Sequence, residues 1–268
     1  MKTKKSLGQH FLRSKDALHV IIEAAGVREG ETVLEIGPGE GVLTEALLFA
    51  GAQVVAVETD SRCVMTLNER FAEAIRVRHL ILVEGDIRDE RVAKKLFQKQ
   101  LLGAAPYKLV ANIPYYLTGM LFRLFLERLR QPLAIVFLVQ KEVAEQLSAR
   151  DGKESIFSLS VKIYGEPRYV TTVKRQAFVP PPKVDSAVVA VDNISRARLK
   201  GLRDERYFRV VKAGLGAKRK MLLGNLAHEL KISREKLERI FGEVGIDLHA
   251  RGEDVPVEKW IALAQALK

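Results

Sequence analysis

Short apolar runs alternate with segments of helical periodicity over the first two thirds of the chain. The apolar runs are rich in aliphatic and β-branched residues and predict strands at residues 32–36, 53–57, 80–83, 108–111 and 134–139. The segments between them have helical spacing and lie at residues 41–50, 62–74, 90–101 and 119–130. This alternation predicts a doubly wound α/β domain, in which helices cover both faces of a mainly parallel sheet.

Two further strand-like runs, at residues 169–173 and 187–191, flank the rigid turn Pro180-Pro181-Pro182. They predict an antiparallel addition at the edge of the sheet. After Asn193 the chain becomes basic and then shows helical patterns only. We therefore expect a first domain over residues 1–194 and a small all-helical domain over residues 195–268.

Helix boundary signals support the second domain. Ser233 is the predicted N-cap of a helix over residues 234–241, because its hydroxyl can accept a hydrogen bond from the first turn. Pro256 suits the first turn of a helix over residues 257–267.

The net charge of +11 over 268 residues indicates a polyanionic partner, either nucleic acid or a membrane surface. The longest apolar run, residues 133–139, is too short to span a bilayer, and the basic amino terminus is not followed by an apolar segment. The single cysteine, Cys63, excludes an internal disulfide framework, and no Cys/His cluster has metal-ligand spacing. We therefore expect a cytoplasmic protein with neither a membrane nor a metal partner.

A glycine-rich turn joins the first predicted strand to a helix. Gly37, Gly39 and Gly41 allow the backbone to approach a ligand closely. Position 42 is valine, so the Gly-x-Gly-x-x-Gly spacing of dinucleotide sites is not met, which disfavours a nicotinamide oxidoreductase. Glu58 ends the second strand, where an acid can accept both hydroxyls of a ribose. Asp86 follows the third strand and could accept the amino group of an adenine, although a loop carboxylate or N-cap role is the simpler alternative.

The segment Asn112-Ile113-Pro114-Tyr115 follows the fourth strand and suggests methylation of an amino group on a nucleic-acid base. An exocyclic amine is a poor nucleophile because its lone pair is delocalised into the ring. The Asn112 amide oxygen and the Ile113 carbonyl could accept its hydrogens and localise that lone pair, while Tyr115 stacks on the base. An ordinary turn after a strand is the alternative for this tetrapeptide.

Taken together, these motifs resemble those of the small-subunit ribosomal RNA adenine dimethyltransferases. The segments that carry the resemblance are Lys5-Ser6-Leu7-Gly8-Gln9-His10-Phe11-Leu12, Glu35-Ile36-Gly37-Pro38-Gly39, Val57-Glu58, Gly85-Asp86, Asn112-Ile113-Pro114-Tyr115, Val139-Gln140-Lys141-Glu142-Val143-Ala144 and Phe178-Val179-Pro180-Pro181-Pro182-Lys183-Val184-Asp185-Ser186-Ala187. The resemblance implies a Rossmann-like class I methyltransferase domain that uses S-adenosylmethionine. It also implies dimethylation of two adjacent adenines in the hairpin near the 3′ end of 16S ribosomal RNA, within an immature small subunit. We expect the protein to be a monomer.

The resemblance also implies roles for individual residues. Those expected to contact the cofactor are His10, Leu12, Gly37, Glu58, Asp86 and Asn112. Asn112 is expected where cofactor and target amine converge, Tyr115 and Phe178 form an aromatic clamp around the extruded base, and Tyr116 widens that platform. Without the resemblance, Phe178 would be interpreted as a core residue ahead of a proline turn.

A basic triplet, Lys218-Arg219-Lys220, is the expected RNA contact of the helical domain. The family usually has an aromatic residue shortly before this triplet, whereas Gly214 and Gly216 occur here. A solvated basic face is the alternative for the triplet.

Two other functions remain open from the sequence. One is adenine methylation of 23S ribosomal RNA, as in the antibiotic-resistance relatives. The other is a non-catalytic role in small-subunit assembly.

Overall fold

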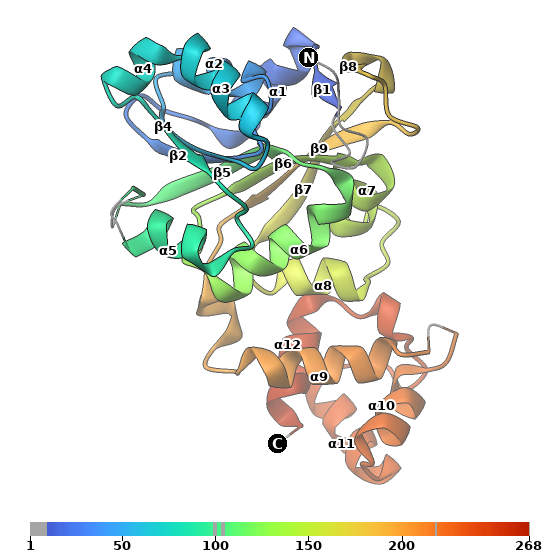
Figure 1. The fold of residues 1–268 in the computed structure, drawn as a ribbon. Helices are drawn as coiled ribbons and strands as arrows, with labels where there is room; N and C mark the ends of the chain where they lie inside the picture. Colours follow the sequence, from blue (N-terminus) through green and yellow to red (C-terminus); the bar gives the residue numbers. More distant parts are fainter. Residues whose placement is uncertain (1–9, 99–100, 103–104, 218, 268) are drawn as a thin grey trace. The chain divides into compact units, whose positions relative to one another are not determined.

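The computed structural model describes residues 10–98, 101–102, 105–217 and 219–267, which form two compact units (Figure 1). The first unit comprises the described residues up to Ala144 together with Arg168–Ile194. The second comprises Glu145–Pro167 and the described residues from Ser195 onward. The chain therefore contributes to the second unit twice, first through residues 145–167 and again after residue 194.

The first unit is built on a seven-stranded sheet with the strand order β4-β3-β2-β5-β6-β9-β7. Its strands are β2 (Thr32–Ile36), β3 (Gln53–Glu58), β4 (Leu80–Glu84), β5 (Tyr107–Asn112), β6 (Ile135–Gln140), β7 (Glu166–Val173) and β9 (Ser186–Asp192). The neighbours from β4 to β6 pair in parallel, and β9 runs antiparallel to β6 with Ile135 opposite Val191. The predicted parallel sheet is confirmed, as is the antiparallel addition of β9.

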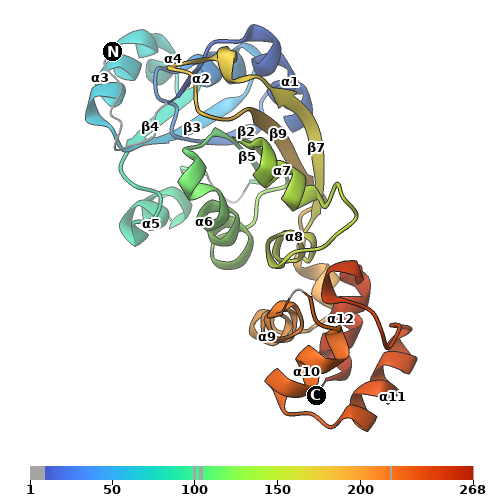
Figure 2. The same cartoon turned by 90° about the vertical axis from the view of Figure 1, so that its right-hand side faces the viewer.

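Helices cover both faces of this sheet, as Figures 1 and 2 show. On one face lie α1 (Lys15–Ala25), α2 (Val42–Phe49), α3 (Ser61–Arg70) and α4 (Ala72–Arg76). On the other lie α5 (Glu90–Gln98) and α6 (Thr118–Arg123), and α7 (Lys141–Ser148) follows β6. No helix among the described residues is long and apolar enough to cross a membrane.

Two predicted helices differ from the structure. The helix expected over residues 62–74 is interrupted at Phe71, whose side chain is buried in the core between α3 and α4. The helix expected over residues 119–130 is α-helical only through Arg123 and continues as a π-turn over Leu124–Arg128. In the second case the apolar side chains Leu121, Phe122, Phe125 and Leu126 are all buried, as the predicted stripe requires.

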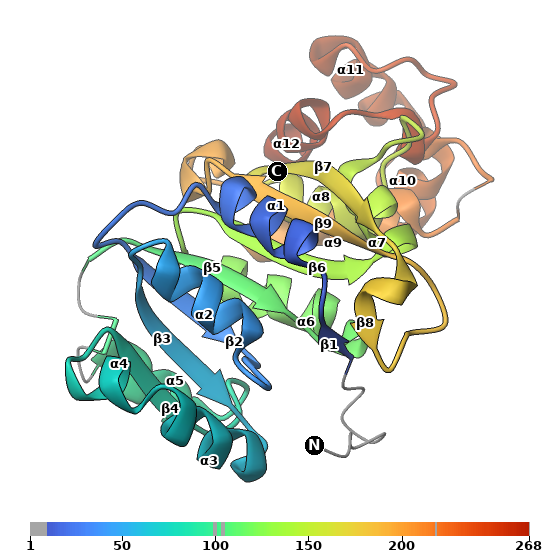
Figure 3. The same ribbon diagram turned by 90° about the horizontal axis from the view of Figure 1, so that it is seen from above.

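A small second sheet joins the amino-terminal segment to the proline turn. β1 (Phe11–Leu12) pairs antiparallel with β8 (Phe178–Val179), with Leu12 opposite Phe178. Figure 3 shows β1 beside β8 and ahead of α1 in the chain. The Leu12 and Phe178 side chains are both buried in the hydrophobic core, so this pairing anchors residues 11–12 to the first unit.

The second unit is helical and has its own core. Its helices are α8 (Ile156–Lys162), α9 (Asp204–Leu215), α10 (Leu222–Leu230), α11 (Arg234–Val244) and α12 (Val257–Ala266). Tyr207, Phe241 and Trp260 are fully buried in it. Ser233 accepts a hydrogen bond from the amide of Lys236, which confirms the predicted N-cap of α11.

Gly214 has a packing reason in α9. A Cβ at this position would clash with side-chain atoms of Leu222 and Trp260. The departure from the family pattern at residues 214–217 therefore coincides with a close approach between α9, α10 and α12.

Candidate active site

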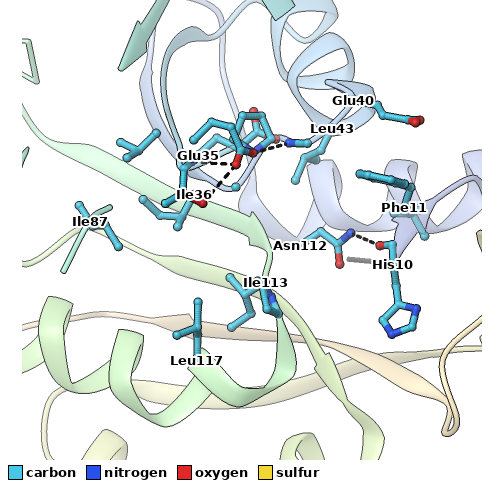
Figure 4. Close-up of a pocket in the computed structure, with 18 of the residues that line it drawn as sticks. His10, Phe11, Glu35, Ile36, Glu40, Leu43, Ile87, Asn112, Ile113 and Leu117 are labelled. Atoms are coloured by element: carbon cyan, nitrogen blue, oxygen red, sulfur yellow. Dashed lines mark hydrogen bonds between the residues drawn. The ribbon is translucent and has the colours of Figure 1, made fainter. Parts of the chain in front are cut away.

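A pocket opens at the carboxyl ends of β2, β3, β4 and β5, which are neighbours in the sheet (Figure 4). Parallel strands present their carboxyl ends at one edge, so groups far apart in the sequence meet there. Eight of the predicted site residues line this pocket: His10, Leu12, Gly37, Glu58, Asp86, Asn112, Tyr115 and Tyr116. Pockets at this edge are where open α/β sheets bind their ligands.

The glycine turn shapes one wall. Gly37 and Gly41 have φ values of +69° and +81°, which side chains rarely allow. A Cβ at Gly41 would approach the Phe71 ring to 2.5 Å, whereas a Cβ at Gly37 would meet nothing within 4 Å. Gly37 thus presents its backbone to open space on the pocket side, and Gly41 lets α2 begin close against α3 and α4.

Glu58 is a preorganised acceptor at the end of β3. Its Oε1 accepts hydrogen bonds from the amides of Thr59 and Asp60 at 2.8 Å, and its Oε2 accepts one from the amide of Gly39 at 2.9 Å. Only 5% of the residue is exposed. The carboxylate is therefore held in one orientation at the pocket wall, with further lone pairs able to accept hydroxyl hydrogens.

Glu35 lines the same pocket, although its sequence position suggested no role. It is 1% exposed and its Oε2 accepts the Thr44 hydroxyl hydrogen at 2.7 Å. Burial raises the pKa of Glu35 to about 8, the Thr44 hydrogen bond works in the opposite direction, and the nearby Glu58 charge adds to the increase. The sequence does place an acid two residues before Gly37. An acid inside a predicted strand, however, does not by itself indicate that its side chain is buried.

Asp86 forms an ion pair with Arg88 that the sequence did not indicate. Its Oδ1 accepts hydrogen bonds from the backbone amide and the Nε of Arg88, at 2.8 and 2.9 Å. The Arg88 guanidinium holds the pKa of the Asp86 carboxyl below its usual value. Asp86 is thus both the loop carboxylate of the simpler interpretation and a pocket residue, with Arg88 beside it in the lining.

Asn112 is oriented by the amino-terminal segment. Its Nδ2 donates a hydrogen bond to the backbone carbonyl of His10 at 3.2 Å, as Figure 4 shows. Because one end of the amide is held by this bond, the other end, Oδ1, is directed away from His10. The contact joins residues 102 positions apart and depends on β1 lying across the strand ends.

Tyr115 is fixed by two contacts. Its hydroxyl forms a hydrogen bond with Ser186 Oγ at 2.6 Å, and its carbonyl accepts the Thr118 hydroxyl hydrogen at 2.9 Å. Burial raises the pKa of Tyr115. Tyr116, by contrast, is 62% exposed at the pocket rim. The two adjacent tyrosines therefore differ: the Tyr115 side chain is fixed by a hydrogen bond, whereas the Tyr116 side chain is exposed to solvent.

Phe178, expected at the base clamp, is not among the residues that line this pocket. Its side chain is 2% exposed and belongs to the hydrophobic core. β8 pairs with β1 there, and Leu12 lies opposite it. The Phe178 side chain thus packs in the core, as the proline turn alone suggests, and its role in the aromatic clamp stays a prediction.

The basic triplet lies in the second unit. Arg219 and Lys220 are exposed between α9 and α10, and Lys218 lies outside the described residues. Among the residues that the structure does describe, no group of three or more His, Cys, Asp or Glu side chains is arranged to hold a metal ion.

The sheet order and the pocket at its edge define a Rossmann-like methyltransferase domain followed by helices. Residues 1–268 match the sequence profile of the family described as ribosomal RNA adenine dimethylase. The chain is 40% identical to the ribosomal RNA small subunit methyltransferase A of Dehalococcoides mccartyi over 97% of this chain and 87% of that protein. The protein of the same name from a Nostoc species is 36% identical over 100% of this chain and 98% of the relative. The chain therefore belongs to the ribosomal RNA adenine dimethylase family.

Solved structures share this fold over nearly the whole chain. The 23S rRNA methyltransferase ErmE superimposes with a TM-score of 0.77 at 27% identity, covering 96% of this chain and 99% of that one. A dimethyladenosine transferase from Plasmodium falciparum superimposes with a TM-score of 0.75 at 24% identity, covering 95% and 96%. The predicted fold class is confirmed.

Proposed function

We propose that this protein transfers methyl groups from S-adenosylmethionine to the exocyclic amino groups of two adjacent adenines in the 3′-terminal hairpin of 16S ribosomal RNA. The observation that carries the proposal is the convergence of Glu58, Asp86, Asn112 and Tyr115 in one pocket. Glu58 and Asp86 are suited to bind the nucleoside part of the cofactor. Asn112 and Tyr115 are suited to bind the target base. The small-subunit relatives at 36–40% identity support this choice of RNA.

The pocket fits the proposed cofactor. The Glu58 carboxylate, held by three backbone amides, is suited to accept ribose hydroxyls. Asp86 shares its oxygens with Arg88, but a carboxylate has about four acceptor positions and can also accept an adenine amine. The open space over Gly37 allows close approach to the backbone. When bound, S-adenosylmethionine supplies a methyl group on a positively charged sulfur, which is already activated for transfer and would leave as the neutral thioether of S-adenosylhomocysteine.

The residues of the chain then mainly orient and desolvate the target amine. Asn112 Oδ1 accepts one amine hydrogen, and the His10 carbonyl keeps the amide from rotating. Tyr115 stacks on the base, and Ser186 holds its hydroxyl. No strong base is required, because the amine becomes acidic only as its new bond forms. An asparagine can therefore serve where a base would otherwise be expected.

The helical unit and the net charge of +11 are the proposed means of binding the RNA. The target base must leave its stack to enter the pocket, which costs a few kcal/mol. A pocket that holds one base has little contact with the neighbouring sequence, so the two adenines are selected mostly through the shape and phosphates of the hairpin. We therefore expect efficient methylation of immature small-subunit particles and poor methylation of an isolated hairpin.

The test compares the unsubstituted protein with Asn112→Ala on small-subunit particles that lack the modification. The expected result is loss of most turnover in the variant, with particle binding retained. Mass mapping of the two adenines identifies the product. A near-normal single-turnover rate in Asn112→Ala would contradict the role of Asn112.

Two outcomes would support other functions. Preference for large-subunit RNA would instead support 23S rRNA methylation, the activity by which ErmE, at 27% identity to this chain, is named. Particle binding by the unsubstituted protein without any methyl transfer would support a non-catalytic role in assembly.

A further inference from the structure

Arg88 holds the Asp86 carboxylate through a forked set of hydrogen bonds at the pocket. The Arg88 Nε donates to both Asp86 oxygens at 2.9 Å, and its Nη2 donates to Oδ2. The Arg88 backbone amide donates to Oδ1 at 2.8 Å. Both residues line the pocket. The carboxylate is therefore fixed by a single neighbour, which uses its backbone and its side chain together.

These contacts leave room for one more donor on Asp86. A carboxylate has about four acceptor positions, divided between its two oxygens. The backbone hydrogen, the shared Nε hydrogen and one Nη2 hydrogen of Arg88 fill about three of them. The Asp86 side chain is 34% exposed, so a ligand can reach what remains. Arg88 thus both orients the carboxylate and determines which acceptor position stays free.

The backbone before Asp86 is fixed as well. The amide of Gly85 donates a hydrogen bond to the carbonyl of Glu58 at 2.8 Å, which joins the end of β4 to the end of β3. Gly85 has a φ of +150°, and a Cβ there would approach a Val92 side-chain atom of α5 to 2.6 Å. Because the backbone is held on both sides, the main freedom left to Asp86 is the direction of its carboxylate, and Arg88 restricts it.

A second pair with the same spacing follows directly in the chain. Arg91 donates to Asp89 through its backbone amide, its Nε and its Nη2, as Arg88 does to Asp86. Neither Asp89 nor Arg91 lines the pocket. The fork is thus a local feature of the Asp-x-Arg spacing, and at Asp86 it acts on a carboxylate of the pocket wall.

We propose that Arg88 is a positioning residue of the cofactor site, which holds the Asp86 carboxylate with its free acceptor position toward the 6-amino group of the cofactor adenine. This inference rests on the proposed function, because it requires S-adenosylmethionine in this pocket. It assigns part of the selectivity for adenine to a residue that acts through Asp86.

The fork influences the bound adenine in two opposing ways. A carboxylate that is oriented in advance loses less rotational freedom when the ligand binds, which favours affinity. The Arg88 hydrogens also draw on the same oxygens, which weakens each oxygen as an acceptor. Because about one acceptor position stays free, we expect the gain from orientation to exceed this loss.

The test measures by calorimetry how the full-length protein binds two ligands. One is S-adenosylhomocysteine, and the other is its analogue in which a hydrogen atom replaces the 6-amino group of the adenine. The ratio of the two dissociation constants reports the contact of that amino group. The variants are Arg88→Ala, Arg88→Lys and Asp86→Ala. Arg91→Ala is the matched control, because it removes the same fork outside the pocket.

The unsubstituted protein should prefer S-adenosylhomocysteine to the analogue, and Asp86→Ala should lose this preference. Arg88→Ala should bind S-adenosylhomocysteine roughly 3- to 10-fold more weakly, the range expected for one weakened hydrogen bond, and its affinity for the analogue should stay within about twofold. Arg88→Lys should fall between Arg88→Ala and the unsubstituted protein, since an ammonium keeps the charge but not the planar fork. Arg91→Ala should keep the full preference.

Several outcomes would overturn the inference. An unchanged preference in Arg88→Ala would show that the fork does not act on the adenine, and tighter binding of S-adenosylhomocysteine would show that Arg88 competes for Asp86. An equal loss of affinity for both ligands would make Arg88 a general support of the pocket. An equal loss of preference in Arg91→Ala would assign the effect to surface charge, and a preference retained in Asp86→Ala would place the amino group elsewhere.

The proposed function fails by a different result. If the unsubstituted protein bound neither S-adenosylhomocysteine nor S-adenosylmethionine, the cofactor assignment itself would be refuted, whatever the Arg88 variants do. Methylation of immature small-subunit particles by the unsubstituted protein, together with an unchanged preference in Arg88→Ala, would keep the proposed function and reject only the role of Arg88.

Discussion

The buried Glu35 side chain should make the first unit less stable as the pH rises. A carboxylate in an ion pair has the opposite effect, since it makes a protein less stable as the pH falls. The side chain is buried at the end of β2 with Thr44 as its hydrogen-bond donor. Burial raises its pKa to about 8 in the folded chain, from its ordinary value of 4.5. The folded state therefore holds a proton that the unfolded state releases between these two values.

The sign and size of the effect follow from this difference in bound protons. Because the folded pKa is raised, the stabilising contribution is fully present below about pH 4.5 and is lost as the pH rises through about 8. One proton corresponds to about 1.4 kcal/mol per pH unit, so the contribution of Glu35 to the free energy of unfolding should fall by about 2–3 kcal/mol between about pH 5 and about pH 7. Glu35→Gln removes the titration while keeping an oxygen for Thr44.

The assay is amide hydrogen exchange of peptides spanning β2 and β3, from about pH 5 to about pH 8, corrected for intrinsic exchange rates. The difference in protection between Glu35→Gln and the unsubstituted protein should increase with pH. A constant offset is also expected, because the new amide group needs partners of its own. Glu29→Gln makes the same chemical change at an exposed position and serves as the matched control. Parallel pH profiles for Glu35→Gln and the unsubstituted protein would show that Glu35 is not protonated in the folded chain.

The other predictions concern the cofactor, the RNA and the helical unit. Glu58→Ala should weaken S-adenosylmethionine binding by about 1.5–3 kcal/mol through lost charge-assisted hydrogen bonds, and nicotinamide dinucleotides should not bind; calorimetry that finds unchanged affinity would reject the ribose role. Neutralising Lys218, Arg219 and Lys220 together should lower RNA affinity and flatten its salt dependence, because fewer counterions are released; an unchanged slope would make the triplet a solvated face. Gly214→Ala should destabilise the helical unit by about 1–3 kcal/mol through overpacking, measured by urea unfolding with the single tryptophan as reporter; unaltered stability would mean that the neighbouring side chains move aside freely.

The sheet and most of the pocket could be predicted from the sequence for a local reason. In a parallel sheet, each strand is a short apolar run and each carboxyl end lies at the same edge. Gly37, Glu58, Asp86 and Asn112 each follow such a run, so their meeting in one pocket needs only the strand order. The N-cap at Ser233 is equally local, since it depends on a hydroxyl three residues before an amide.

What the sequence could not determine depends on contacts between distant segments. The burial of Phe178 comes from the pairing of β8 with β1, and the orientation of Asn112 comes from a carbonyl 102 residues earlier. The raised pKa of Glu35 depends on the layers packed around β2. The close approach of Trp260 to Gly214 is likewise a contact between distant segments. Residue type and spacing determined which groups reach the sheet edge, whereas tertiary packing decided which of them are held, buried or exposed.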